Sequence, residues 1–163
     1  MTAFNAWLYG SGFSEWVRES SSLWAYPCVL FLHSIGLAIL VGLTSAIALR
    51  VLGVAKQLPV GPLERLYPLI WAGFWINAVS GSVLYAADAV KNWANPLLFV
   101  KLGVVAVALV VTMKMKSVVF SNPNPDADTL PAMAKGLAMA SLALWAGAIA
   151  AGRMMAYWKE TVQ

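Results

Sequence analysis

The sequence predicts an all-α integral membrane protein, a four-helix transmembrane bundle with a short N-terminal interfacial segment. Hydrophobic residues make up 61% of the 163 residues and charged residues only 11%, which is far from the composition of a soluble domain. Long apolar blocks alternate with short polar or proline- and glycine-rich stretches. The net charge is +4, but the basic residues are scattered around the apolar blocks and form no stripe, which excludes nucleic acid as a partner.

The N-terminal segment and the first transmembrane helix differ in polarity. Residues 1–22 mix aromatic side chains with glycines and charges, so we expect this segment to lie at the level of the lipid headgroups. The first transmembrane helix is predicted over residues 24–54. It carries no charged residue from Pro27 to Leu49, and this stretch rises roughly 33 Å as a helix, which matches the hydrocarbon core of a bilayer.

Three further transmembrane helices are predicted over residues 63–89, 96–115 and 130–158. Asn95 and Pro96 supply an amide cap and a first-turn proline for the third helix. Small and polar residues share one face of the second helix, which we expect to point into the bundle: Gly73, Asn77, Ser80, Gly81, Leu84 and Asp88. This face could serve close helix packing, with Asn77 hydrogen-bonded to a neighbouring helix. A role in a substrate site is the alternative.

The distribution of basic residues predicts the orientation in the membrane. Four spans place both termini and the middle loop on one side, and the first and third loops on the other. The terminal side carries three basic residues and the opposite side six, so the first loop and the third loop, around Asn122 to Asp128, are predicted to be cytoplasmic. We therefore expect a multi-pass protein of the bacterial inner (cytoplasmic) membrane with both termini periplasmic or external.

His33 is the only histidine of the chain and lies inside the first transmembrane helix. Ionisable groups are costly in lipid and usually face a bundle interior, so His33 is the first candidate for chemistry. Counted from the helix ends, His33 lies about 13 Å deep, Lys101 about 9 Å and Arg153 about 8 Å, all from the same membrane face. Asp88 lies near the same level. Groups from four helices are thus predicted to converge on one layer.

The surroundings of His33 fit a haem. Gly36, one helical turn further on, leaves space for something flat and large beside the imidazole. The imidazole can hold the iron, while Lys101 and Arg153 can pair with propionates nearer the interface. We therefore predict His33 as a metal ligand, and Gly36, Lys101 and Arg153 as further cofactor-binding residues. A packing or proton-handling role for His33 is the alternative.

Other site chemistries have less support. A zinc or copper site needs several His, Cys or carboxylate ligands, and Cys28 lies on a different helical face from His33. A proton path would need an acidic group in mid-membrane, where the polar candidate is Asn77, which does not titrate. A bis-histidine cytochrome within one chain is excluded by the single histidine.

Three runs carry a resemblance to known membrane proteins: LHSIGLAILVG from residue 32, NPLLFVKL from residue 95 and LWAGAIAAGRMMAYW from residue 144. Over nearly the whole chain, the sequence resembles an uncharacterised bacterial family of small four-helix membrane proteins. More distantly, it is similar to the HemJ-type protoporphyrinogen oxidases and the copper-resistance D-type membrane proteins. The HemJ-type resemblance implies a haem b bound through His33, with Lys101 at the position of the family's third-helix lysine.

These observations favour a membrane-embedded haem b or tetrapyrrole binding protein that serves redox or electron-transfer chemistry, as an oxidoreductase or as a subunit of one. A non-catalytic membrane subunit or scaffold of a larger complex is the first alternative. A small-molecule transporter that uses Asn77 and Asp88 is the second. Because the helices carry long apolar faces, we also expect a homo-oligomer or a membrane complex in the lipid bilayer.

Overall fold

The computed structural model describes residues 2–122 and 130–161, with the side chains of 156 and 158–161 left aside. Within these residues the secondary structure is helical and includes no strand: α1 (Ala3–Tyr9), α2 (Gly12–Glu19), α3 (Tyr26–Val51), the 3-10 helix η1 (Gly61–Leu66), α4 (Tyr67–Ala87), α5 (Ala89–Ala94), α6 (Pro96–Phe120) and α7 (Ala132–Thr161). Four of the described helical segments are long and apolar enough to cross a membrane. The predicted all-α bundle is confirmed.

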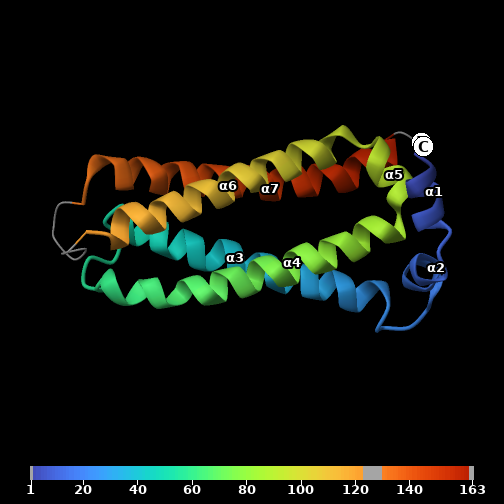
Figure 1. Ribbon diagram of the computed structural model, residues 1–163, viewed down its shortest axis with the longest axis horizontal. Coiled ribbons are helices and arrows are strands. Elements are labelled where there is room, and N and C mark those ends of the chain that lie inside the picture. Colours follow the sequence, from blue (N-terminus) through green and yellow to red (C-terminus); the bar gives the residue numbers. More distant parts are fainter. Residues whose placement is uncertain (1, 123–129, 162–163) are drawn as a thin grey trace.

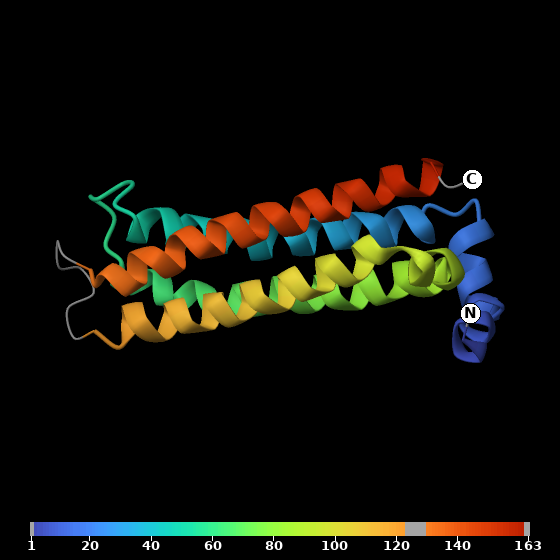
Figure 2. The same cartoon turned by 90° about the horizontal axis from the view of Figure 1, so that it is seen from above.

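The four long helices run side by side, and the short helices gather at one end (Figure 1). Helices α1, α2 and α5 lie at the end where α3 and α6 begin and α4 finishes. The C-terminal part of α7 reaches the same end, as the view from above shows (Figure 2). The predicted third loop lies mostly in residues 123–129, outside the described residues.

The start of α6 follows the sequence pattern, but its end does not. The Asn95 side chain accepts a hydrogen bond from the backbone N–H of Leu97 at 3.0 Å, and Pro96 occupies the first turn, as predicted. The helix continues to Phe120, five residues beyond the predicted end at 115. The aliphatic stems of its lysines can run along the helix towards water, so charge near residue 115 does not stop the helix.

The region around the second span is also divided differently from the prediction. The chain enters through η1, and α4 begins only at Tyr67. At Asp88 the backbone leaves the helical region, with φ −139° and ψ 46°, and the chain turns into α5. The segment KNWAN, which the sequence predicts as a plain connection, is therefore largely helical.

Helices α3 and α4 pack closely because glycines remove side chains from their crossing. A Cβ atom added at Gly36 would lie 2.6 Å from the backbone N of Asn77, and one added at Gly73 would lie 2.9 Å from the backbone N of Leu40. No side chain fits at such distances. The small-residue face of the second helix therefore points into the bundle, as predicted.

Helices α6 and α7 form the other closely packed pair, and α3 joins the two pairs by packing on α7. Helices α4 and α6 have little direct contact along their length. Most of the buried core lies in the half of the bundle remote from α1 and α2, where Ile47, Ile70, Met115 and Trp145 are almost fully buried. The half next to the short helices has fewer buried side chains and more polar ones.

The N-terminal segment is amphipathic. Ser14 and Val17 of α2 are fully buried against the bundle, whereas large side chains on the other face of α1 and α2 are exposed: Phe4, Trp7, Phe13 and Trp16. Aromatic side chains of this kind favour the membrane–water interface. The segment covers the end of the bundle beside α4 and α5.

Candidate functional site

The His33 side chain is fixed against α4 by hydrogen bonds that determine its tautomer. Its Nδ1 lies 3.0 Å from the backbone oxygen of Asn77 and 3.2 Å from Oγ of Ser80. A carbonyl oxygen can only accept, so Nδ1 carries the proton in this arrangement. The Ser80 hydroxyl donates to the backbone oxygen of Ile76 at 2.6 Å and keeps a lone pair for the imidazole. The Nε2 atom of the neutral ring therefore carries the free electron pair.

Asn77 completes this connection from the opposite direction. Its side-chain amide donates to the backbone oxygen of His33 at 2.8 Å. This oxygen lies in the middle of α3, where it also serves as an acceptor of the helix, so the amide adds a second hydrogen bond. The bonding of Asn77 across the bundle is the packing role that the sequence left open.

Gly81 leaves room for the imidazole ring against α4. A Cβ atom added at this residue would lie 3.0 Å from Cε1 of His33 and 3.3 Å from its Nδ1. Any larger residue would push the ring away from α4 and weaken its contact with the Asn77 carbonyl. The glycine of the α4 face therefore positions the histidine.

A cavity with a volume of about 720 Å³ begins at the His33 ring, and we call it the His33 cavity. Its walls come from α3, α4, α6 and α7, and α1, α2 and α5 contribute at the membrane-interface end. The lining residues are Tyr9, Arg18, Tyr26, His33, Gly81, Leu84, Tyr85, Ala87, Asp88, Lys91, Asn92, Leu98, Lys101, Gly152 and Met155. Its size falls in the range of sites for small molecules and cofactors.

Lys101 reaches the cavity from α6 across a glycine of α7. A Cβ atom added at Gly152 would lie 3.6 Å from Nζ of Lys101 and 3.7 Å from its Cε. The side chain is half-buried, so its ammonium group lies at the cavity while its stem runs over α7. A larger residue at position 152 would compete for the space of that stem.

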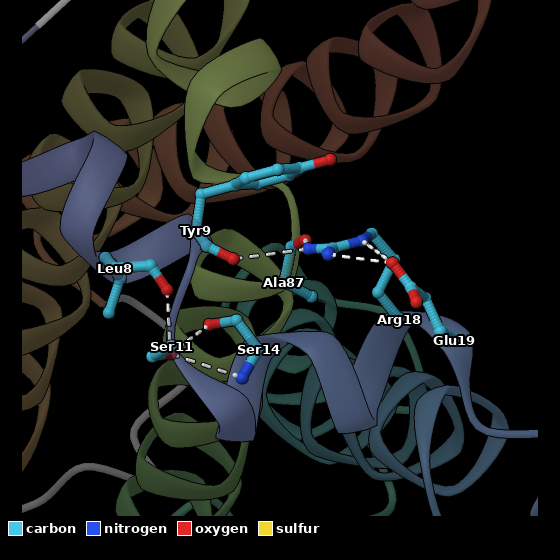
Figure 3. Close-up of polar contacts among 7 residues, drawn as sticks. All are labelled: Leu8, Tyr9, Ser11, Ser14, Arg18, Glu19 and Ala87. Carbon is cyan, nitrogen blue, oxygen red and sulfur yellow. Dashed lines mark hydrogen bonds and ion pairs between the residues drawn. The ribbon is translucent and has the colours of Figure 1, made fainter.

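Arg18 of α2 lines the cavity at the end of the bundle beside α1 and α2, and Figure 3 shows its polar contacts. Its guanidinium group donates to the backbone oxygen of Ala87 at 3.1 Å and to that of Tyr9 at 3.5 Å, and it lies 4.1 Å from the centroid of the Tyr9 ring. It also pairs with Glu19 at 3.0 Å. One side chain thus ties the N-terminal segment to the end of α4.

Ser11 shapes the turn that brings Arg18 to this position. Its hydroxyl donates to the backbone oxygen of Leu8 at 2.8 Å, and its oxygen accepts from the backbone N–H of Ser14 at 3.3 Å, as Figure 3 shows. Ser11 is therefore the N-cap of α2. The cap sets the angle between α1 and α2, which places Tyr9 above the Arg18 guanidinium.

The lining of the cavity is amphipathic and carries an excess of positive charge. Among the described lining residues, Arg18, Lys91 and Lys101 are cationic and Asp88 is acidic, and Arg18 is paired with Glu19. Leu84, Leu98 and Met155 supply apolar wall. This combination suits a ligand with an apolar body and anionic groups at its interface end.

Two of the four predicted site residues come together, and two do not. His33 and Lys101 both line the His33 cavity. The space beside Gly36 is occupied by the α4 backbone, so this residue serves helix packing and not a ligand. Arg153 has an exposed side chain on α7 and does not line the cavity. A further cation of the lining is Arg18, which belongs to the predicted interfacial segment 1–22.

Among the described residues, no group of three or more His, Cys, Asp or Glu side chains comes together. Cys28 is a free cysteine and lies outside the cavity lining. The His33 imidazole is therefore the strong nitrogen donor of the cavity. In comparisons with family models, curated proteins and solved structures, no match to this chain was found.

Proposed function

We propose that the protein binds a haem b or a similar tetrapyrrole in the His33 cavity and serves redox or electron-transfer chemistry there, alone or as a subunit of a membrane complex. The observation that carries the proposal is the state of His33, whose Nδ1 is bonded to the Asn77 carbonyl within a cavity of about 720 Å³. Histidines that bind metals typically donate their second ring nitrogen in this way, which orients the ring and leaves the other nitrogen basic.

The residues of the cavity fit such a group. Nε2 of His33 would hold the iron, the apolar wall would contact the macrocycle, and the Lys101 ammonium group would pair with a propionate. A bound haem supplies one-electron redox chemistry. The contribution of the chain is to orient the imidazole through Asn77 and Ser80 and to cover the site with α1 and α2.

The absorption spectrum tests the proposal. Purified protein supplied with haem is expected to show a Soret band, and His33→Ala is expected to lose it or to lower the haem occupancy about tenfold or more, while folding survives because the bundle is held by many apolar contacts. Ser34→Ala is the matched control, because Ser34 is an exposed neighbour whose hydroxyl bonds its own helix. A colourless wild type, or a His33→Ala variant with an unchanged spectrum, would contradict the proposal and favour a non-catalytic subunit or a transporter.

We also propose that the protein lies in the bacterial inner membrane with both termini on the periplasmic side. The excess of basic residues in the first and third loops supports this orientation. In this orientation, the His33 cavity and its cover of α1 and α2 face the periplasm. An electron donor or acceptor would then approach from that side.

A further inference from the structure

The Ser80 hydroxyl of α4 takes part in two hydrogen bonds at once. It lies 2.6 Å from the backbone oxygen of Ile76 and 3.2 Å from that of Asn77, so it donates to Ile76, as serines in helices often do. Its oxygen also lies 3.2 Å from Nδ1 of His33. A serine hydroxyl can donate and accept at the same time. Ser80 therefore connects the imidazole N–H to the α4 backbone through a chain of two hydrogen bonds.

Two acceptors share the Nδ1 proton of His33. They are the backbone oxygen of Asn77, at 3.0 Å, and Oγ of Ser80. Gly81 allows the ring to come this close to α4, because a Cβ atom there would lie 3.3 Å from Nδ1. The Asn77 carbonyl belongs to the main chain, so no substitution removes it. Ser80 is thus the acceptor that depends on the identity of a side chain.

Burial strengthens this chain of hydrogen bonds. Ser80 is only 5% exposed. Hydrogen bonds are stronger away from water, and a hydroxyl that already donates is a better acceptor, because the bonds of a chain polarise one another. An acceptor at Nδ1 draws the N–H proton away from the ring and makes the other ring nitrogen a stronger ligand. The expected effect of Ser80 is therefore a higher electron density on Nε2.

A second serine of α4 supplies a comparison. Ser82 also donates to the backbone oxygen four residues earlier, that of Ala78, at 2.9 Å. Its side chain is exposed and lies outside the lining of the His33 cavity. A bond to its own helix is thus shared by both serines, whereas the contact with the imidazole distinguishes Ser80 from Ser82.

We propose that Ser80 is a positioning residue that raises the electron density on Nε2 of His33 and thereby lowers the reduction potential of an iron bound there. Ser80 acts through His33 and does not itself line the cavity. A more electron-rich imidazole favours ferric over ferrous iron. The effect on the iron rests on the proposed haem site, whereas the hydrogen bond to His33 does not.

NMR of isotope-labelled histidine tests the hydrogen bond in the full-length protein without haem. His33 is the only histidine, so the labelled protein gives the signals of one imidazole. Ser80→Ala removes one of the two acceptors, and the Nδ1 proton is expected to exchange with water about fivefold faster, as the loss of one hydrogen bond implies. Ser82→Ala is the matched control and is expected to exchange at the wild-type rate. Equal rates in Ser80→Ala and the wild type would overturn the role of Ser80.

Redox titration of the haem-loaded protein tests the effect on the iron. At the potential where half of the wild-type haem is reduced, Ser80→Ala is expected to raise the ratio of ferrous to ferric haem about fivefold, and Ser82→Ala to leave it unchanged. An unchanged or lower ratio in Ser80→Ala would overturn the proposed effect on the potential. A wild type that binds no haem would contradict the proposed function, while the exchange rates would still decide whether Ser80 holds the His33 proton.

Discussion

At the scale of single residues, His33 shows how a side chain inside a membrane is prepared for one role. Nδ1 of His33 is hydrogen-bonded to the backbone oxygen of Asn77, and the absence of a side chain at Gly81 leaves space for the ring. Nε2 keeps its electron pair. An imidazole that served only helix packing would need no cavity beside it. Here it borders a cavity that also receives the Lys101 side chain.

Lys101→Met distinguishes two roles of this lysine, which are a ligand of the iron and a partner of a propionate. If the amine ligates the iron, the variant is expected to shift the Soret and visible bands of the haem complex. If the ammonium group pairs with a propionate, the bands stay and haem is lost about five times faster, since an ion pair of a half-buried lysine is worth about 1 kcal/mol. Spectra and dissociation rates measured with apomyoglobin as acceptor distinguish the two. A variant that matches the wild type in both would remove Lys101 from the site. Lys135→Met is the control, because Lys135 is exposed in the first turn of α7 and does not line the cavity.

At the scale of elements, the α3–α4 crossing contributes both to helix packing and to the position of His33. Gly36 and Gly73 bring the two backbones together, and the same approach allows the reciprocal hydrogen bonds between His33 and Asn77. Helix packing and the orientation of the His33 ring are thus properties of one helix pair.

Gly36→Leu is expected to destabilise this pair, because its Cβ atom would meet the backbone of Asn77 at 2.6 Å. Overpacking of this kind costs about 1–3 kcal/mol, so the thermal midpoint in detergent should fall by several degrees. The displaced helix would also weaken haem retention. Gly42→Leu is the control on the same helix, since a Cβ atom there meets nothing within 4 Å. Equal midpoints for the two variants would contradict a close crossing at Gly36.

At the scale of the whole molecule, the two ends of the bundle differ. The end with α1, α2 and α5 is polar and holds the His33 cavity, whereas the other half holds most of the buried core. The orientation of the bundle therefore decides which side of the membrane reaches the His33 cavity.

Cysteine labelling measures that orientation. In a Cys28→Ala background, Ser21→Cys is expected to react with a membrane-impermeant maleimide in intact spheroplasts, and Gln57→Cys only after permeabilisation. Both positions are exposed, and they lie in the connections before and after α3, which spans the bundle. The reverse pattern would invert the topology that the basic residues predict.

Native mass spectrometry from mild detergents tests self-association. Large side chains on the outer faces of α3 and α4 remain exposed, including Phe31 at 64%, Trp75 at 62% and Val79 at 62%. Because close packing can drive association of apolar helices in lipid, we expect the mass of a dimer or higher oligomer. A single-chain mass across several detergents would show that lipid alone covers these faces.

The sequence alone determined the membrane class, the four spans, the cap at Asn95 and the inward face of the second helix. These features are set by local hydropathy and helical periodicity, which a single chain displays in full. Hydropathy does not locate the ends of the spans, because lysine stems allow α6 to continue to Phe120.

Only the tertiary structure decided which residues share a site. Depth along a helix is readable from residue numbers, but the direction of a side chain around the bundle depends on how each helix is rotated against its neighbours. Arg153 and Gly36 lie at plausible depths, yet one faces outwards and the other is covered by α4. Arg18 enters the site because the N-terminal segment docks on the end of α4, a long-range contact that no local pattern encodes.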